Sequence, residues 1–117
     1  MDEMLRNKLT DISIDVDKAL EYMMGNEAFF IKILKKFISD ENFDALRQAM
    51  SNGDTDTAFR AAHTLKGISS NLSIASLDRP LIEITDALRS GNIEKARIYM
   101  PEVLKSYTEL TDAVKSI

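Results

Sequence analysis

The fold of this chain is decided by one stretch, residues 54–72, which reads DTDTAFRAAHTLKGISSNL. When the stretch is placed on a helical wheel at about 100° per residue, its apolar side chains gather on one side, which must be a buried face. His63, the only histidine in the chain, falls roughly opposite the centre of that face. The stretch therefore predicts an amphipathic helix that presents its histidine to solvent. Its apolar side chains are Ala58, Ala61, Ala62, Leu65, Ile68 and Leu72.

The rest of the chain is predicted to be helical as well, because helix formers dominate and β-branched residues do not alternate with polar ones. Turn signals stand at residues 25–26, 52–54 and 90–92, each with an N-cap residue directly after its glycine. The polar stretch at residues 39–42 is a weak point, but no proline forces a break there. We expect no strand, and we expect helices at residues 15–24, 27–51, 54–71, 74–90 and 93–115.

Short turns between long amphipathic helices favour antiparallel neighbours. We therefore predict an all-α fold, an antiparallel up-down four-helix bundle with a short extra N-terminal helix that covers one end. Pro80 and Pro101 each remove a backbone donor, so each should kink its helix or mark a helix start. The 117 residues suit a single domain, residues 1–117, that can bury its own core. We expect a monomer, because no extra apolar stripe is evident. Met1 and the short leader favour a free-standing protein, but the sequence alone does not decide between this and a module cut from a hybrid kinase.

Composition excludes several classes of protein. Without cysteine, the chain has no disulfide scaffold, thiolate zinc site or cysteine nucleophile. It has no apolar run of about 18 residues, and its acidic N-terminus lacks the apolar core of a signal peptide. The formal charge, 15 − 19 = −4, makes nucleic acid a poor partner, because binding it depends on neutralising phosphates. We therefore expect a cytoplasmic protein that binds neither nucleic acid nor membrane.

The surroundings of His63 distinguish it from an ordinary surface histidine. Gly67 lies in mid-helix, where glycine costs about 1 kcal/mol relative to alanine, so its presence points to a functional demand. Lys66 follows His63 by three residues and can reach a group that the imidazole carries. A neutral imidazole nitrogen is a good nucleophile toward phosphorus, and a lone histidine cannot build a metal site. The exposed side near His63 is nearly free of acid, and its other polar residues are Arg60, Thr64 and Ser70.

The motif AHTLKG at residues 62–67 resembles the A-H-x-L-K-G signature of the histidine phosphotransfer (HPt) domain. DVDKAL at residues 15–20, followed by GNE at 25–27, is similar to the family's N-terminal pattern, and the resemblance covers about residues 12–117. The chain departs from the family at two positions. Ser73 stands where the family often has glycine, and we interpret it as the N-cap of the next helix. Pro80 replaces an ordinary helix residue and is expected to distort the start of that helix.

The resemblance implies a role for each residue around the histidine. His63 would take a phosphoryl group from a response-regulator receiver aspartate or give one to it, Lys66 would stabilise the phosphohistidine by its charge, and Gly67 would leave space for the receiver. The chain would be a phosphocarrier of a multistep two-component phosphorelay rather than an enzyme, with receiver domains and a hybrid histidine kinase as partners. It would need no cofactor of its own, because the receiver supplies the magnesium. The residues expected to dock the receiver are Arg60, Thr64 and Ser70.

Two alternatives compete with this interpretation. A degenerate bundle that binds a partner without phosphorylation is disfavoured, because His63, Lys66 and Gly67 are retained together. A histidine kinase dimerisation domain has the pattern H-E-[LI]-[RK]-[TN]-P. It is disfavoured because Thr64 replaces the acid, Ile68 stands where the proline should be, and no ATP-binding segment follows.

Overall fold

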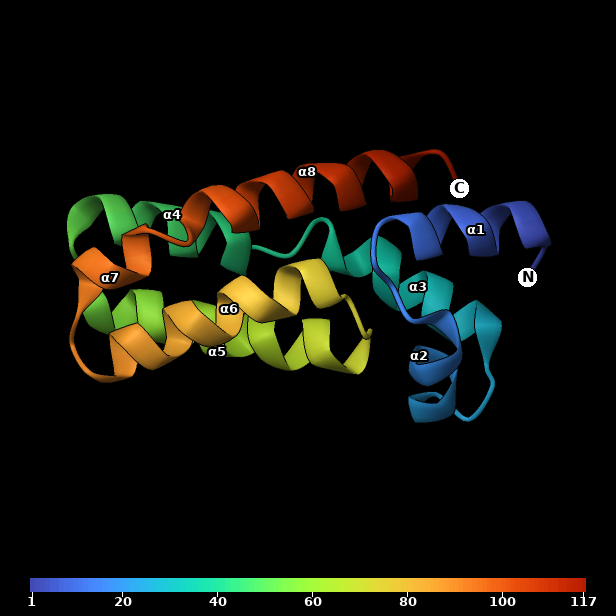
Figure 1. Cartoon of the computed structure of the whole chain (residues 1–117), viewed down its shortest axis with the longest axis horizontal. Helices are drawn as coiled ribbons and strands as arrows, with labels where there is room; N and C mark the ends of the chain where they lie inside the picture. Colours follow the sequence, from blue (N-terminus) through green and yellow to red (C-terminus); the bar gives the residue numbers. More distant parts are fainter.

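The computed structural model describes the whole chain, residues 1–117, as helices joined by short turns (Figure 1). The prediction of an all-helical protein without strands is confirmed, and the only bridge between extended residues joins Ile14 to Ile74. The helices expected at residues 15–24, 54–71 and 74–90 are present as α2, α5 and α6. The full set is α1 (Glu3–Asp11), α2 (Val16–Tyr22), α3 (Glu27–Phe37), α4 (Asn42–Asn52), α5 (Thr55–Asn71), α6 (Ala75–Arg89), α7 (Ile93–Arg97) and α8 (Met100–Lys115).

The single helix predicted for residues 27–51 is wrong, because the chain leaves the helical path between α3 and α4. Asp40 organises this break. Its carboxylate accepts hydrogen bonds from the backbone amide and the side-chain amide of Asn42, both at 2.8 Å. The hydroxyl of Ser39 donates to the carbonyl of Lys36 at 3.2 Å. Such bonds from side chains to the local backbone compete with the helical ladder, so the polar stretch ends α3 without a proline.

The single helix predicted for residues 93–115 is also wrong, because it is divided into α7 and α8. Pro101 lies in the first turn of α8, where a missing amide proton removes no helical bond. The prediction that this proline marks a helix start is confirmed. α1 lies outside the predicted helices, and the carboxylate of Asp2 caps it by accepting from the amide of Leu5 at 2.7 Å.

The packing of α5 fixes which of its faces meets solvent. α5 contacts α4 and α6, and α6 contacts α7 and α8 in turn. Figure 1 shows α4, α5, α6 and α8 running lengthwise, each reversing the direction of the one before it. α1, α2 and α3 lie toward the end of the molecule that is opposite α7. The apolar face predicted for α5 lies in the hydrophobic core, apart from Ile68, which is half-buried at its edge. Its core members are Ala58, Ala61, Ala62, Leu65 and Leu72.

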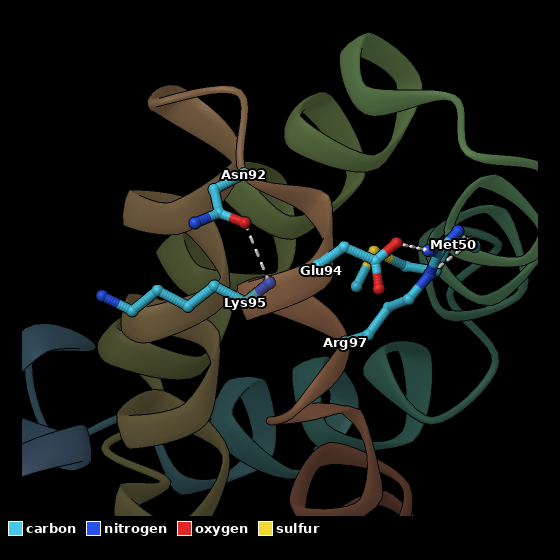
Figure 2. A network of polar contacts seen from close by, with 5 residues as sticks. All are labelled: Met50, Asn92, Glu94, Lys95 and Arg97. Carbon is cyan, nitrogen blue, oxygen red and sulfur yellow. Dashed lines mark hydrogen bonds and ion pairs between the residues drawn. The ribbon is translucent and has the colours of Figure 1, made fainter.

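Arg97 fastens α7 to the end of α4 (Figure 2). Its Nε and Nη2 atoms donate to the carbonyl of Met50 at 3.1 and 2.7 Å. This carbonyl is one of those that the last turn of α4 leaves without a partner in its own helix. Glu94 pairs with the same guanidinium, and Asn92 caps α7 by accepting from the amide of Lys95 at 3.1 Å. These contacts close one end of the helical assembly.

Pro80 does not interrupt α6, which continues on both sides of it. A proline leaves the carbonyl four residues earlier without its helical donor, and here that carbonyl belongs to Ser76. Ser106 of α8 supplies the missing donor, because its hydroxyl lies 3.1 Å from the Ser76 oxygen. The proline thus exchanges a bond within α6 for a bond between α6 and α8.

The hypothesis that Ser73 is the N-cap of α6 is wrong. The N-cap is Ile74, which makes no side-chain capping bond. Ser73 ends α5 in the left-handed conformation, with φ at +56°. Its amide donates to the carbonyl of Ser70 at 3.1 Å, and the amide of Ile74 donates to that of Ser69 at 3.0 Å. This is the turn in which helices usually place glycine, and the buried hydroxyl of Ser73 has no hydrogen-bond partner.

A second left-handed serine, Ser13, ends α1 in the same way, with φ at +66°. The two turns lie against each other. The amide of Asp15 donates to the carbonyl of Ser73, and the amide of Ala75 donates to the carbonyl of Ser13, both at 3.0 Å. Through these bonds the N-terminal segment is joined to the start of α6.

We predict that Ser73→Gly raises the free energy of unfolding by about 1 kcal/mol, because glycine adopts the left-handed conformation without the steric cost that serine bears. Urea denaturation followed by helical circular dichroism measures the change. Ser73→Ala is the matched control, since it removes the unpartnered hydroxyl but keeps the strained backbone. An alanine variant as stable as the glycine variant would show that the hydroxyl, and not the backbone, limits stability.

Candidate functional site on the exposed face of α5

His63 lies on the exposed side of α5, opposite the alanines that face the core. The helix that carries it starts at a strong cap. The carboxylate of Asp54 accepts from the backbone amide of Thr57 at 3.1 Å. Hydrogen bonds from the side chain and the amide of Thr57, with the charge of Arg60 adding to them, hold the pKa of Asp54 below its ordinary value. The carboxyl group of Asp54 is therefore ionised at neutral pH, and its negative charge interacts favourably with the positive, N-terminal end of the helix dipole.

The other residues expected at the site lie along the same helix. Arg60, Thr64, Gly67 and Ser70 are exposed, and Lys66 is half-buried. Their position on one side of α5 follows directly from their spacing, because residues three and four apart are neighbours on a helix surface.

The two cations beside His63 have no ionic partner within the chain. None of the ion pairs in the structure involves Arg60 or Lys66, and neither side chain donates a hydrogen bond. The imidazole of His63 is likewise free of hydrogen bonds to the rest of the chain. An anionic group carried on this imidazole would therefore find unpaired positive charge nearby rather than displace an existing ion pair.

The space beside Gly67 is open. A Cβ atom placed on this residue would meet no other atom within 4 Å, apart from its own helix backbone and chain neighbours. Neither positive φ nor tight helix packing explains the glycine. The structure thus gives no internal reason for a residue that weakens the helix one turn after His63.

Ser70 is engaged with α6. Its hydroxyl donates to the carboxylate of Asp78 at 2.5 Å, and the hydroxyl of the buried Ser69 donates to the same oxygen at 3.1 Å. The expectation that the exposed side near His63 is nearly free of acid holds for the nearest residues of α5, but α6 brings this carboxylate to Ser70. Sequence reasoning missed Asp78, because its approach depends on how the two helices pack.

Phe59 is a second neighbour that sequence reasoning missed. Its ring centroid lies 5.8 Å from that of His63, with the two planes inclined at 35°. Arg89 of α6 lies over the Phe59 ring, with Cζ 5.7 Å from the centroid, and it pairs with Asp86 at 2.9 Å. The spacing of four residues between Phe59 and His63 is the signal that could have found the contact between the rings.

No group of three or more His, Cys, Asp or Glu side chains that could hold a metal ion comes together in the structure, around His63 or elsewhere. One of the largest hollows, of about 380 Å³, lies elsewhere, between α6 and α8, and it is lined mainly by polar residues that include Arg79, Glu102 and Lys105. No helix has the length and apolar character needed to cross a membrane. The chemistry that the site can supply is that of an exposed nucleophile with cations beside it.

The sequence of the chain matches a known family of domains. The family model of the Hpt domain matches residues 34–115, a segment that runs from α3 into α8 and contains His63. The chain belongs to the Hpt domain family. No curated protein and no solved structure matches it. Hpt domains are helical phosphocarrier modules that act in histidine phosphotransfer rather than as catalysts. The matched segment of this Hpt domain leaves out α1 and α2.

We predict that a side chain at position 67 stabilises α5 or leaves its fold intact but slows phosphotransfer. Gly67→Ala should raise the free energy of unfolding by about 0.5–1 kcal/mol, because alanine loses less backbone freedom in a helix and the added methyl meets open space. Thermal unfolding measures this change. Gly67→Gln should retain the fold but slow phosphotransfer from a receiver far more than alanine does, because its longer side chain obstructs close approach to His63. A glutamine variant that transfers at the wild-type rate would exclude a role for the glycine in docking.

Proposed function

We propose that this Hpt domain carries a phosphoryl group on His63, to or from the aspartate of a response-regulator receiver, within a multistep two-component phosphorelay. The observation that carries the proposal is the exposed, unbonded imidazole of His63, with the unpaired ammonium of Lys66 and the open space at Gly67 on the next turn. A phosphocarrier needs an accessible nucleophile and room for its partner, and these residues provide both.

The transfer step requires little chemistry from this chain. The ring nitrogen of His63 that bears no proton attacks the phosphorus of the aspartyl phosphate. The bond from phosphorus to the aspartate oxygen breaks, and the carboxylate leaves with the bonding electron pair. The other ring nitrogen keeps its proton or loses it to water. Phosphoryl transfer is governed by positioning and by neutralisation of charge. Magnesium held by the receiver would supply most of that neutralisation.

Lys66 contributes after the phosphoryl group has arrived. The ammonium, three residues after His63, can approach the phosphoryl oxygens, and it forms no ion pair in the chain that would have to be broken first. The contact is partly screened by water, so its effect is on the order of 1 kcal/mol. This is enough to shift the transfer equilibrium but not to determine whether transfer occurs.

The proposed receiver docks on the exposed side of α5, with Arg60, Thr64 and Ser70 at its edge, and a hybrid histidine kinase supplies the phosphoryl group upstream. Because the hydroxyl of Ser70 already donates to Asp78, this residue would serve the docking surface as an acceptor. The proposal includes no nucleic-acid partner and no cofactor held by this chain itself.

We further propose that α4, α5, α6 and α8 form an up-down four-helix bundle, that residues 1–117 are one domain, and that the protein is a cytoplasmic monomer. The reversal of direction between successive helices in Figure 1 and the single hydrophobic cluster of 26 residues support the first two statements. In this arrangement α5 is held by neighbours on both sides, so His63 is presented on a rigid support.

We predict that phosphoryl label from a receiver charged with acetyl phosphate appears on this protein in an acid-labile, base-stable form, as expected for phosphohistidine. His63→Gln should abolish the label, and because the chain has no other histidine, no second site can replace it. Circular dichroism of the variant should match the wild type, since the side chain makes no structural hydrogen bond. Label that persists in His63→Gln would refute the assignment.

We predict that Lys66→Ala is still phosphorylated but that its transfer equilibrium moves toward the receiver by up to about fivefold, the effect of a screened contact of about 1 kcal/mol at most. The equilibrium is measured at low salt from the partition of label between the two proteins. Lys95→Ala, at an exposed lysine on α7, is the matched control for loss of one positive charge. An equilibrium that Lys66→Ala and Lys95→Ala shift equally would rule out a specific role for Lys66.

A further inference from the structure

Phe59 is the one side chain shown in ring contact with the imidazole of His63. The ring centroids are 5.8 Å apart and the planes inclined at 35°, a tilted arrangement within the range that aromatic pairs prefer. No hydrogen bond orients the imidazole. Rotation about the bond to its ring is a soft motion for histidine, so the ring adopts the orientation that its contacts allow.

The position of Phe59 on the helix gives the contact a direction. Long side chains of a helix lean toward its N-terminal end and cover the residues three and four positions earlier. His63 therefore leans onto Phe59, four residues before it. Lys66 and Gly67 lie on the following turn, where the side chain of Lys66 is unpaired and the space at Gly67 is open. The imidazole is supported on its N-terminal side by Phe59, and the open space on the following turn is that at Gly67.

Phe59 is itself held in place. It is half-buried, and the guanidinium of Arg89 lies over its ring at 5.7 Å, a cation–π arrangement that joins α5 to α6. Asp86, three residues earlier on α6, pairs with Arg89 at 2.9 Å and limits the directions that the guanidinium can take. The support behind His63 thus rests on a neighbouring helix.

We propose that Phe59 is a positioning residue for phosphotransfer, which holds the imidazole of His63 in the orientation from which a docked receiver delivers or removes the phosphoryl group. The proposal rests on the proposed function of His63. A receiver brings its aspartyl phosphate along one fixed line, so it requires a defined ring orientation. A small phosphoryl donor approaches from any direction and requires none.

The test compares two donors on the same variants. One donor is a purified receiver domain charged with acetyl phosphate, and the other is phosphoramidate, whose phosphorus–nitrogen bond breaks and whose nitrogen leaves as ammonia after taking up a proton. Phe59→Leu removes the ring but keeps an apolar side chain, and Phe59→Tyr keeps the ring. Tyr22→Leu removes an exposed ring from α2 and serves as the control. Phe59→Met is used if the leucine variant does not fold.

Phe59→Leu is expected to slow transfer from the receiver by about three- to tenfold, the factor that corresponds to losing one aromatic pair, with phosphorylation by phosphoramidate unchanged. Phe59→Tyr and Tyr22→Leu should transfer at the wild-type rate. In the unphosphorylated protein, the ring protons of His63 should lose their ring-current shift in Phe59→Leu and keep it in Phe59→Tyr, as measured by NMR.

Equal rates from the receiver in the wild type and Phe59→Leu overturn the proposal, and so does an equal slowing with both donors, because that would place the effect on the reactivity of His63. Unchanged His63 shifts in Phe59→Leu overturn it without any reference to transfer. A wild-type protein that accepts label from neither donor overturns the proposed function itself. A wild-type protein that accepts label from the receiver, beside an equally fast Phe59→Leu, overturns the role of Phe59 alone.

Discussion

Burial of one face of α5 between its neighbouring helices is the constraint on which the rest of the structure depends. Ala58, Ala61, Ala62 and Leu65 are almost completely removed from water, and α4 and α6 both pack against this helix. Turning α5 by about 100°, the angle between successive residues, would carry Leu65 into solvent and His63 toward the core. The loss of apolar burial opposes such a turn, because that burial is the main favourable term in folding. The exposure of His63 is therefore a consequence of hydrophobic packing on the opposite side of its own helix.

Polar contacts then fix the two ends of α5 without covering its centre. Asp54 caps the first turn, while Ser69 and Ser70 bind Asp78 of α6 at the last. Between these ends the charged side chains beside His63 remain unpaired, although charged residues elsewhere on the surface form ion pairs within their own helices. The distribution of contacts thus separates the parts of α5 that hold the fold together from the part that is available to a partner.

In the proposed function, the site divides its chemistry between two proteins. The surface around His63 holds no cluster of metal ligands, and His63 itself is exposed on α5. In that proposal the chain would contribute a nucleophile, nearby positive charge, room at Gly67 and the aromatic support of Phe59. An arrangement that leaves metal and acid chemistry to the partner suits a carrier, because the phosphoryl group must be protected between encounters and reactive only within a complex. Membership of the Hpt domain family agrees with this division.

The sequence by itself determined the helical class, most of the turns, the exposed side of α5 and the AHTLKG motif, because periodicity, capping and motif spacing are local properties of the chain. It also placed Lys66 and Gly67 beside His63, since residues three and four apart are neighbours on any helix. Only the tertiary structure decided that residues 39–42 break a helix and that Ser73 adopts a left-handed turn, because each outcome depends on competing hydrogen bonds and on packing. It alone brought Asp78 and Arg89 of α6 to the face of α5, since contacts between helices depend on their relative rotation, which no spacing within one helix encodes.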